Sequence, residues 1–217
     1  AVVIAQGTLG MLTVTLLLKP AIVLAHLLGG MLTLALLGWM TLTVLRRGSP
    51  AARAGPALRA LALAGLAAVT VQIALGGWTS TNYAALACPD IPQCQGQWWP
   101  DMDFGEGFTV WRGLGVDYEG GVLDNPSRTA IHLVHRLGAI VVTIVLLTLI
   151  ATAWREPRCR GPALAIAAAL ATQVGIGVAI VVQSLPLGLA TAHNGVAAAL
   201  LLAVLNLNHL LHHGRNR

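Results

Sequence analysis

Long stretches of this 217-residue chain contain no Asp, Glu, Lys or Arg. They cover 1–18, 20–45, 60–89, 137–154 and 161–214. A helix needs about 20 mostly apolar residues to span a bilayer, and the last stretch is long enough for two such helices. Lipid cannot satisfy an open backbone, so spans of this kind are helical. The sequence therefore predicts an all-α, polytopic membrane helix bundle with six transmembrane helices, near 1–18, 21–45, 59–81, 128–154, 161–183 and 186–211.

Composition and charge support this class and predict an orientation. Only 10% of the residues are charged, against about 25% in a soluble domain. Seven of the eight acidic residues lie in one long loop, 82–127. The arginines gather on the other side of the predicted topology, at Arg46, Arg47, Arg53, Arg59, Arg155, Arg158, Arg160, Arg215 and Arg217. The positive-inside rule then makes that side and the C-terminus cytoplasmic, in a bacterial-type inner membrane, with the long loop outside. Because the net charge of +5 is divided among short loops, it does not indicate a nucleic-acid partner.

The three cysteines divide between the two sides. Cys88 and Cys94 lie in the outer loop and Cys159 on the cytoplasmic side. An oxidising outer compartment permits a disulfide between the first two, and two prolines stiffen the short segment between them. Two free thiols are the alternative. A zinc site is not expected, because there is no CxxC spacing and no histidine nearby.

A pair of helices recurs along the chain. In each copy, a hydrophobic helix carries a Gln-x-x-x-Gly motif and the next helix carries a histidine. The copies are Gln6 to Gly10 with His26, Gln173 to Gly177 with His193, and, across the long loop, Gln72 to Gly76 with His135. This order predicts that one helix pair precedes Ala1 in an eight-helix parent built of two pseudo-symmetric halves. Residues 1–59 would then be the second pair of the N-terminal half, and 60–217 the C-terminal four-helix half with outer loop 82–127.

Three histidines are predicted to lie at one depth. His26, His135 and His193 follow the outer ends of their helices by six or seven residues, about 9–10 Å at 1.5 Å per residue. Ionisable side chains at such a depth usually have a function, and imidazoles on facing helices can be axial ligands of haem. The predicted helices contain no Asp or Glu, which argues against a proton-relay transporter. Zinc or copper would want Cys, Met or carboxylates at the same depth. Histidines that only hydrogen-bond between helices are the alternative.

The other histidines receive different predictions. His132 lies one turn before His135 on the same face, so only one of the two is expected to bind iron. His135 is preferred because it matches His193 in depth and precedes Arg136, which could pair with a haem propionate. Three further histidines beside Arg215 are predicted to be interfacial side chains at a cytoplasmic helix end. They are His209, His212 and His213.

Over essentially its whole length, the chain resembles the haem A synthases. The segment QIALGGWTSTNYAALACPD at 72–90 is similar to their fifth helix and following loop. HLVHRLGA at 132–139 is similar to their sixth helix, and LPLGLATAHN at 185–194 to the start of their eighth. QGTLGMLTV at 6–14 and AHLLG at 25–29 are similar to their third and fourth.

The resemblance implies a division of roles among the histidines. His135 and His193 would be the two axial iron ligands of a haem b cofactor. His26 would be a catalytic residue, one of two histidines around the substrate haem O. The second belongs to a Glu-x-x-His-Arg motif on the second helix of the family, which this chain lacks. In the segment similar to the sixth helix, His132 occupies the place that the Glu has in that motif. One complete haem site and half of another are therefore expected.

The resemblance also implies an oxidoreductase that converts the C8 methyl of haem O to the formyl of haem A for cytochrome oxidase assembly. Water would supply the oxygen, and electrons would leave through the cofactor haem. Haem O synthase and cytochrome oxidase assembly factors would be partners, beside the lipid bilayer. Two other functions stay open: a non-enzymatic membrane cytochrome b, and a haem-binding assembly factor. A cytochrome that carries electrons across the bilayer needs haem on both sides, whereas all the expected ligands lie on the outer side.

Overall fold

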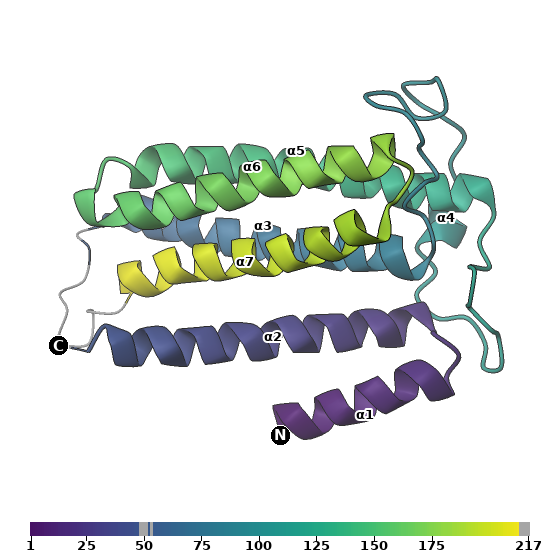
Figure 1. Ribbon diagram of the computed structural model, residues 1–217, viewed down its shortest axis with the longest axis horizontal. Coiled ribbons are helices and arrows are strands. Elements are labelled where there is room, and N and C mark those ends of the chain that lie inside the picture. Colours follow the sequence, from purple (N-terminus) through teal and green to yellow (C-terminus); the bar gives the residue numbers. More distant parts are fainter. Residues whose placement is uncertain (48–51, 53, 213–217) are drawn as a thin grey trace.

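A computed structural model describes residues 1–47, 52 and 54–212, and this part of the chain is helical without strands (Figure 1). Arg53, His213, Arg215 and Arg217 lie outside the described residues. The elements are α1 (Val2–Thr15), α2 (Pro20–Leu45), α3 (Pro56–Thr81), α4 (Phe104–Gly107), α5 (Asn125–Ala153), η1 (Pro157–Cys159), α6 (Arg160–Val182) and α7 (Leu187–His212). The long helices match the predicted ranges to within a few residues, and α4 is an addition within the outer loop.

Proline and one carboxylate determine where several helices begin. Prolines occupy the first turn of α2, α3 and α5, where a missing N–H costs nothing and the fixed φ suits the helix. Asp124 caps α5, because its carboxylate accepts a hydrogen bond from the Ser127 N–H at 3.0 Å.

The three helices that carry the Gln-x-x-x-Gly motif end in the same way. The residue twelve positions after each glutamine donates its N–H to the carbonyl five residues back: Leu18 to Thr13 (2.9 Å), Ala84 to Thr79 (2.9 Å) and Leu185 to Ile180 (2.8 Å). The preceding residue has a left-handed backbone in each case, with φ of 52° to 57° at Leu17, Tyr83 and Ser184. The recurring sequence motif therefore corresponds to a recurring local structure.

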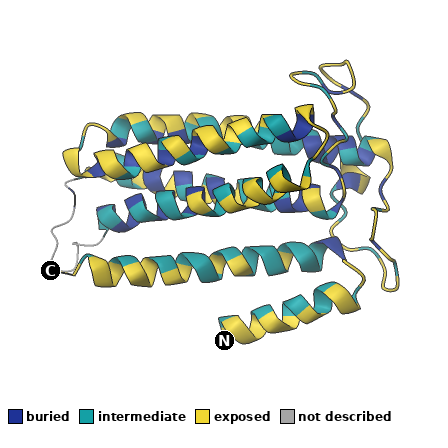
Figure 2. Cartoon of the chain, viewed as in Figure 1, coloured by how far each residue is buried: buried dark blue, intermediate teal, exposed yellow. Residues whose placement is uncertain are grey.

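Four helices form a closed bundle in which α3, α5, α6 and α7 each contact two of the others. Helix α2 packs beside α3 and α7, and α1 packs on α2 (Figure 1). We call the end of the bundle that carries the long loop the loop end, and the opposite end the arginine end. The apolar core lies mainly within the four-helix bundle, whereas α1 and α2 expose most of their surface (Figure 2).

The core divides into two clusters along the bundle axis. The larger one fills the arginine end and stops at Val69, Val142, Leu170 and Leu200. The smaller one lies at the loop end, where Trp78, Ala84, Leu123 and Ile131 pack together. The histidine level falls between the two clusters, so the expected ligands occupy a section of the bundle that neither apolar cluster fills.

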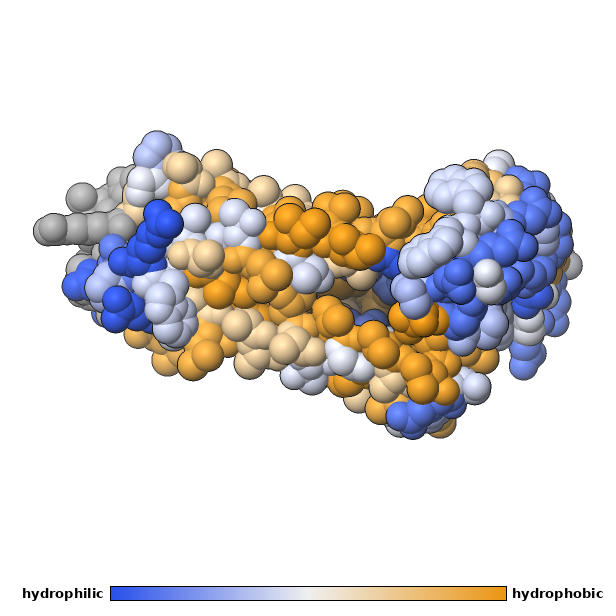
Figure 3. Space-filling view, turned by 90° about the horizontal axis from the view of Figure 1, so that it is seen from above, coloured by the Kyte–Doolittle hydropathy of each residue, from blue (hydrophilic) through white to orange (hydrophobic). Residues whose placement is uncertain are grey.

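The helices have the length and composition of membrane spans. Among the described residues, five qualify: α2, α3, α5, the segment Pro157–Val182 and α7. Helix α1 is apolar but has 14 residues, about 21 Å at 1.5 Å per residue, which is shorter than the roughly 30 Å of a bilayer core. Of the six predicted transmembrane helices, five are long enough to span a bilayer core, and α1 is shorter. Figure 3 shows the corresponding apolar belt between two hydrophilic ends.

Candidate functional site

The best-defined Gln–His pair joins α3 to α5. The Gln72 amide nitrogen lies 3.0 Å from Nδ1 of His135 and donates to the His135 carbonyl at 2.9 Å. One turn further along α3, Gly76 leaves space for the imidazole, because an added Cβ would stand 3.1 Å from its Cε1. Gly138 leaves space for the Gln72 amide in the same way, since a Cβ there would stand 2.3 Å from Oε1. Two glycines thus let a glutamine and a histidine interlock between antiparallel helices.

The pair on α1 and α2 repeats this arrangement. Gln6 donates to the His26 carbonyl at 2.9 Å, and a Cβ on Gly10 would stand 3.2 Å from Cε1 of His26. Gly29 accommodates the glutamine oxygen as Gly138 does on α5. An open pocket of about 370 Å³ adjoins this pair, within the size range of small-molecule sites. Its lining comes from α1, α2 and α7: Gln6, His26, Leu27, Gly30, Met31, Leu34 and Ala198.

The pair on α6 and α7 differs in one respect. The ring of His193 lies against Gly177, where a Cβ would stand 3.2 Å from Cε1. The Gln173 amide nitrogen, however, contacts the ring at Nε2, at 3.2 Å. Val196 stands three residues after this histidine, where the other two pairs have glycine.

Several polar atoms at this level are buried without a hydrogen-bond partner. They are the side-chain oxygens of all three glutamines and Nδ1 of His26 and His193. Buried polar atoms normally have partners, and exceptions need an explanation. No group of three or more His, Cys, Asp or Glu among the described residues could hold a metal ion. Two histidines suffice for haem iron, because the macrocycle supplies the other four nitrogens, so the donor set fits haem.

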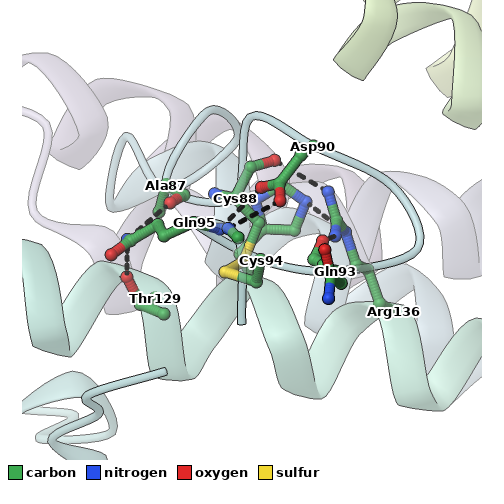
Figure 4. Close-up of a disulfide and its surroundings, with 10 residues drawn as sticks. Ala87, Cys88, Asp90, Gln93, Cys94, Gln95, Thr129 and Arg136 are labelled. Carbon is green, nitrogen blue, oxygen red and sulfur yellow. Dashed lines mark hydrogen bonds between the residues drawn. A yellow bond between two sulfur atoms is a disulfide. The ribbon is translucent and has the colours of Figure 1, made fainter. Parts of the chain in front are cut away.

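His132 and Arg136 hold the outer loop rather than facing the bundle interior. Arg136 donates to the carbonyls of Cys88 at 2.7 Å and Gln93 at 2.9 Å, and its Nε donates to His132 Nε2 at 3.2 Å (Figure 4). Nδ1 of His132 lies 3.3 Å from the Cys88 backbone nitrogen. A guanidinium has five N–H donors, of which these contacts use three, so a propionate contact by Arg136 stays a prediction.

The loop itself is cross-linked. Cys88 and Cys94 form the predicted disulfide, and Cys159 is buried with a free thiol, also as predicted. Within the loop, the Asp90 carboxylate accepts from the N–H groups of Gly96 at 2.8 Å and Gln95 at 2.6 Å. These bonds, led by the one from Gly96, hold the pKa of Asp90 below its usual range. Gln95 also donates to Thr129 on α5 at 2.9 Å (Figure 4).

A second contact ties the later part of the outer loop to the turn between α1 and α2. The ammonium of Lys19 is buried and donates to the carbonyls of Arg112 and Gly113. It also lies 3.6 Å from the centre of the Trp111 ring, a cation–π contact. The Tyr118 N–H donates to the Leu17 carbonyl at 3.1 Å nearby. The outer loop therefore connects the N-terminal helix pair to the four-helix bundle.

The prediction for His209 was wrong. Its side chain is fully buried, packs edge-on against Trp39 and contacts Thr43 at 3.0 Å and Arg46 at 3.1 Å. Arg46 also bonds the side chain of Asn206, so a polar cluster joins α2 to α7 at the arginine end. The sequence could not show this burial, because it depends on the packing of α2 against the C-terminal turns of α7. His212 is half-buried and bonds the Asn208 carbonyl at 2.8 Å.

The sequence predicted on which helices the three histidines lie, but not which side chains contact them. The motif pointed to the glutamines, and their contacts with the histidines required the structure. Nothing in the sequence pattern singled out Lys19 as a loop anchor.

Comparisons with known proteins show the family of this chain. Residues 1–205 match the COX15-CtaA family, described as cytochrome oxidase assembly protein. The chain is 42% identical over 209 residues to the heme A synthase of Shewanella oneidensis, across 96% of this chain and 63% of that protein. It is 31% identical over 186 residues to the heme A synthase of Rhizorhabdus wittichii, across 85% of this chain and 50% of that protein. The chain thus spans between half and two thirds of the length of these two relatives. It belongs to the COX15-CtaA family, as the resemblance of its motifs to the haem A synthases predicted.

Proposed function

We propose that the protein containing this chain is a haem A synthase, an oxidoreductase that converts the C8 methyl of haem O to the formyl of haem A. The observation that carries the proposal is the set of three Gln–His pairs, each with a glycine against its imidazole, between the two apolar clusters. The named relatives support the same activity.

In this proposal His135 and His193 hold the iron of a haem b cofactor. They come from adjacent helix pairs of one four-helix bundle. Because Gly76 and Gly177 have no side chain, the helices that carry them leave room for the imidazoles of His135 and His193. The iron porphyrin supplies the redox chemistry, and the chain supplies binding and orientation.

His26 belongs to the substrate site. Its imidazole lines the pocket between α1, α2 and α7, and its Nδ1 is buried without a partner. That pocket is lined mainly by apolar side chains and opens to the outside of the helices, which suits an amphipathic substrate that arrives from lipid. Two further helices before α1, one with a second histidine, would complete the site in an eight-helix protein of two similar halves. The loop end would face the outer side of the membrane, with six of the eight spans in this chain.

The activity is tested with the full-length protein in membranes or detergent. Incubation with haem O should yield haem A, recognised by the mass change from methyl to formyl. The His26→Ala variant should keep the haem b spectrum and lose the product. Haem b binding without haem A formation in the wild-type protein would favour a haem-binding assembly factor instead.

The ligand assignment has its own test. His135→Ala and His193→Ala should each abolish the low-spin haem b spectrum, because each removes one bond to iron. His132→Ala should affect that spectrum less, since His132 contacts the loop. A His26 variant that loses haem b while the His193 variant keeps it would reverse the assignment.

A further inference from the structure

The proposed function gives no chemical role to the glutamine that begins each Gln-x-x-x-Gly motif. Glutamine is polar and costly to bury in an apolar helix unless it is bonded. Gln6, Gln72 and Gln173 nevertheless lie within apolar helices, at the level of the histidines. Each places its amide nitrogen on the histidine of the neighbouring helix, either on the ring or on the carbonyl of the same residue.

The contact is most complete at Gln72. Its amide nitrogen has two hydrogens, and the two acceptors within 3.0 Å are the Nδ1 and the carbonyl of His135. The bond to the carbonyl fixes the amide on α5, and the contact with Nδ1 then restricts rotation of the ring. Gly76, one turn further along α3, leaves room for the ring, because an added Cβ would stand 3.1 Å from Cε1. Helix α3 thus supplies both the amide that contacts Nδ1 and the space that the imidazole occupies.

We propose that Gln72 is a positioning residue that fixes the imidazole of His135 for iron. The inference rests on the proposed function, because it assigns this ring to haem. Hydrogen bonds from outside the ligand shell orient metal-binding histidines and change the basicity of the ring. Gln6 and Gln173 lie at the corresponding positions but make different contacts, since Gln6 bonds the His26 carbonyl and Gln173 contacts Nε2 of His193.

Either the nitrogen or the oxygen of the Gln72 side-chain amide can contact the ring of His135. If its nitrogen faces Nδ1, that atom accepts and the ring proton is on Nε2. If its oxygen faces Nδ1, that atom donates and Nε2 keeps a free lone pair, the form that a metal requires. The oxygen of Gln72 is buried and has no partner, so it is available for this second arrangement. We assign the oxygen-facing form to the haem-bound protein, in which the amide has turned and its bond to the His135 carbonyl is exchanged for one from Nδ1–H.

The test compares Gln72→Glu and Gln72→Leu with the wild-type, full-length protein purified with haem b. Glutamate has the size of glutamine and can only accept when ionised, so it strengthens the bond from Nδ1–H and makes the ring a stronger donor to ferric iron. We expect the haem b midpoint potential to fall in Gln72→Glu and to rise in Gln72→Leu, with a broadened α-band in the latter. Gln183→Leu, an exposed glutamine at the end of α6, is the matched control and should change neither quantity.

The possible results distinguish a failure of the Gln72 proposal from a failure of the haem assignment. If both Gln72 variants keep the wild-type potential and α-band while His135→Ala loses the haem, Gln72 does not position the ring and the proposed function stands. If His135→Ala keeps the low-spin haem, the haem assignment itself is wrong. If Gln72→Leu does not accumulate in the membrane, Gln72→Glu decides alone, because it preserves the shape of the side chain.

Discussion

At the scale of single residues, the two glycines of α6 provide a matched comparison. A Cβ on Gly177 would stand 3.2 Å from Cε1 of His193, whereas a Cβ on Gly175 would meet nothing within 4 Å. Both substitutions add the same methyl group to the same helix, so helix propensity changes equally. We expect Gly177→Ala to displace the ring and lower haem b retention by about 10-fold, the lower range for disturbed support of a metal ligand. Haem content and the α-band measure the effect, and an equal loss in Gly175→Ala would contradict it.

Arg136 is the other residue whose role is testable alone. It donates to two loop carbonyls and to His132, so Arg136→Met should release the segment around the disulfide while leaving the helix intact. Each hydrogen bond to a charged group stabilises by about 1.5–3 kcal/mol, and the loss should appear as faster amide exchange over residues 88–95. Arg128→Met on the same helix is the control. If haem b retention falls while exchange stays slow, Arg136 acts on the haem propionate instead.

At the scale of elements, the loop between α3 and α5 depends on the Cys88–Cys94 disulfide. Alkylation of the folded protein should label neither residue until reductant is added. Cys159 is buried, so it should react only after unfolding. In Cys88→Ser with Cys94→Ser, the loop should exchange faster while haem b is retained, because no expected ligand lies in the loop. Loss of haem b on reduction alone would show that the loop closes the haem site.

The same loop should respond to acid through Asp90. Bonds from Gly96 and Gln95 lower the pKa of this carboxyl in the folded loop, so the ionised form stabilises the loop. That contribution is complete above the unfolded pKa of about 3.9 and is lost as the pH falls through the lower folded value. Amide exchange at residues 90–97 should therefore accelerate below about pH 4 in the wild type. Asp90→Asn should show fast exchange at neutral pH as well, with little further change on acidification.

At the scale of the whole molecule, two polar contacts add to the packing of α2 on α3 and α7. The Arg46–His209 cluster joins α2 to α7 at the arginine end, and Lys19 joins the turn before α2 to the outer loop at the loop end. Removing the first should loosen α2 from α7 without changing the His135–His193 site. We expect Arg46→Leu to reduce the free energy of unfolding by about 1–3 kcal/mol, measured by thermal inactivation in detergent. A changed haem b spectrum in this variant would show that the two parts are more tightly connected than these contacts indicate.

The sequence predicted the features that depend on local patterns: the helix ranges, the depth of the histidines and the disulfide. Helix ranges followed from the charge-free runs. The histidine level followed from residue counts along regular helices. The disulfide followed from two cysteines only six residues apart in a loop. What the sequence missed depends on contacts between distant segments: Lys19 with Arg112, Arg136 with the loop, and His209 beneath α2. The short α1 also departed from prediction, because hydropathy does not reveal the turn at Leu16 to Leu18.

The division of the core into two clusters has a consequence for the biogenesis of the protein. The arginine end is packed by apolar side chains from α3, α5, α6 and α7, without any part of the histidine level. Newly inserted helices can therefore dock and hold their spacing from that end while the opposite section still lacks its prosthetic group. We expect the polypeptide to accumulate in the membranes of cells starved of haem and to take up the pigment afterwards. Delivery of the cofactor would then be a late maturation step, separate from translation and insertion.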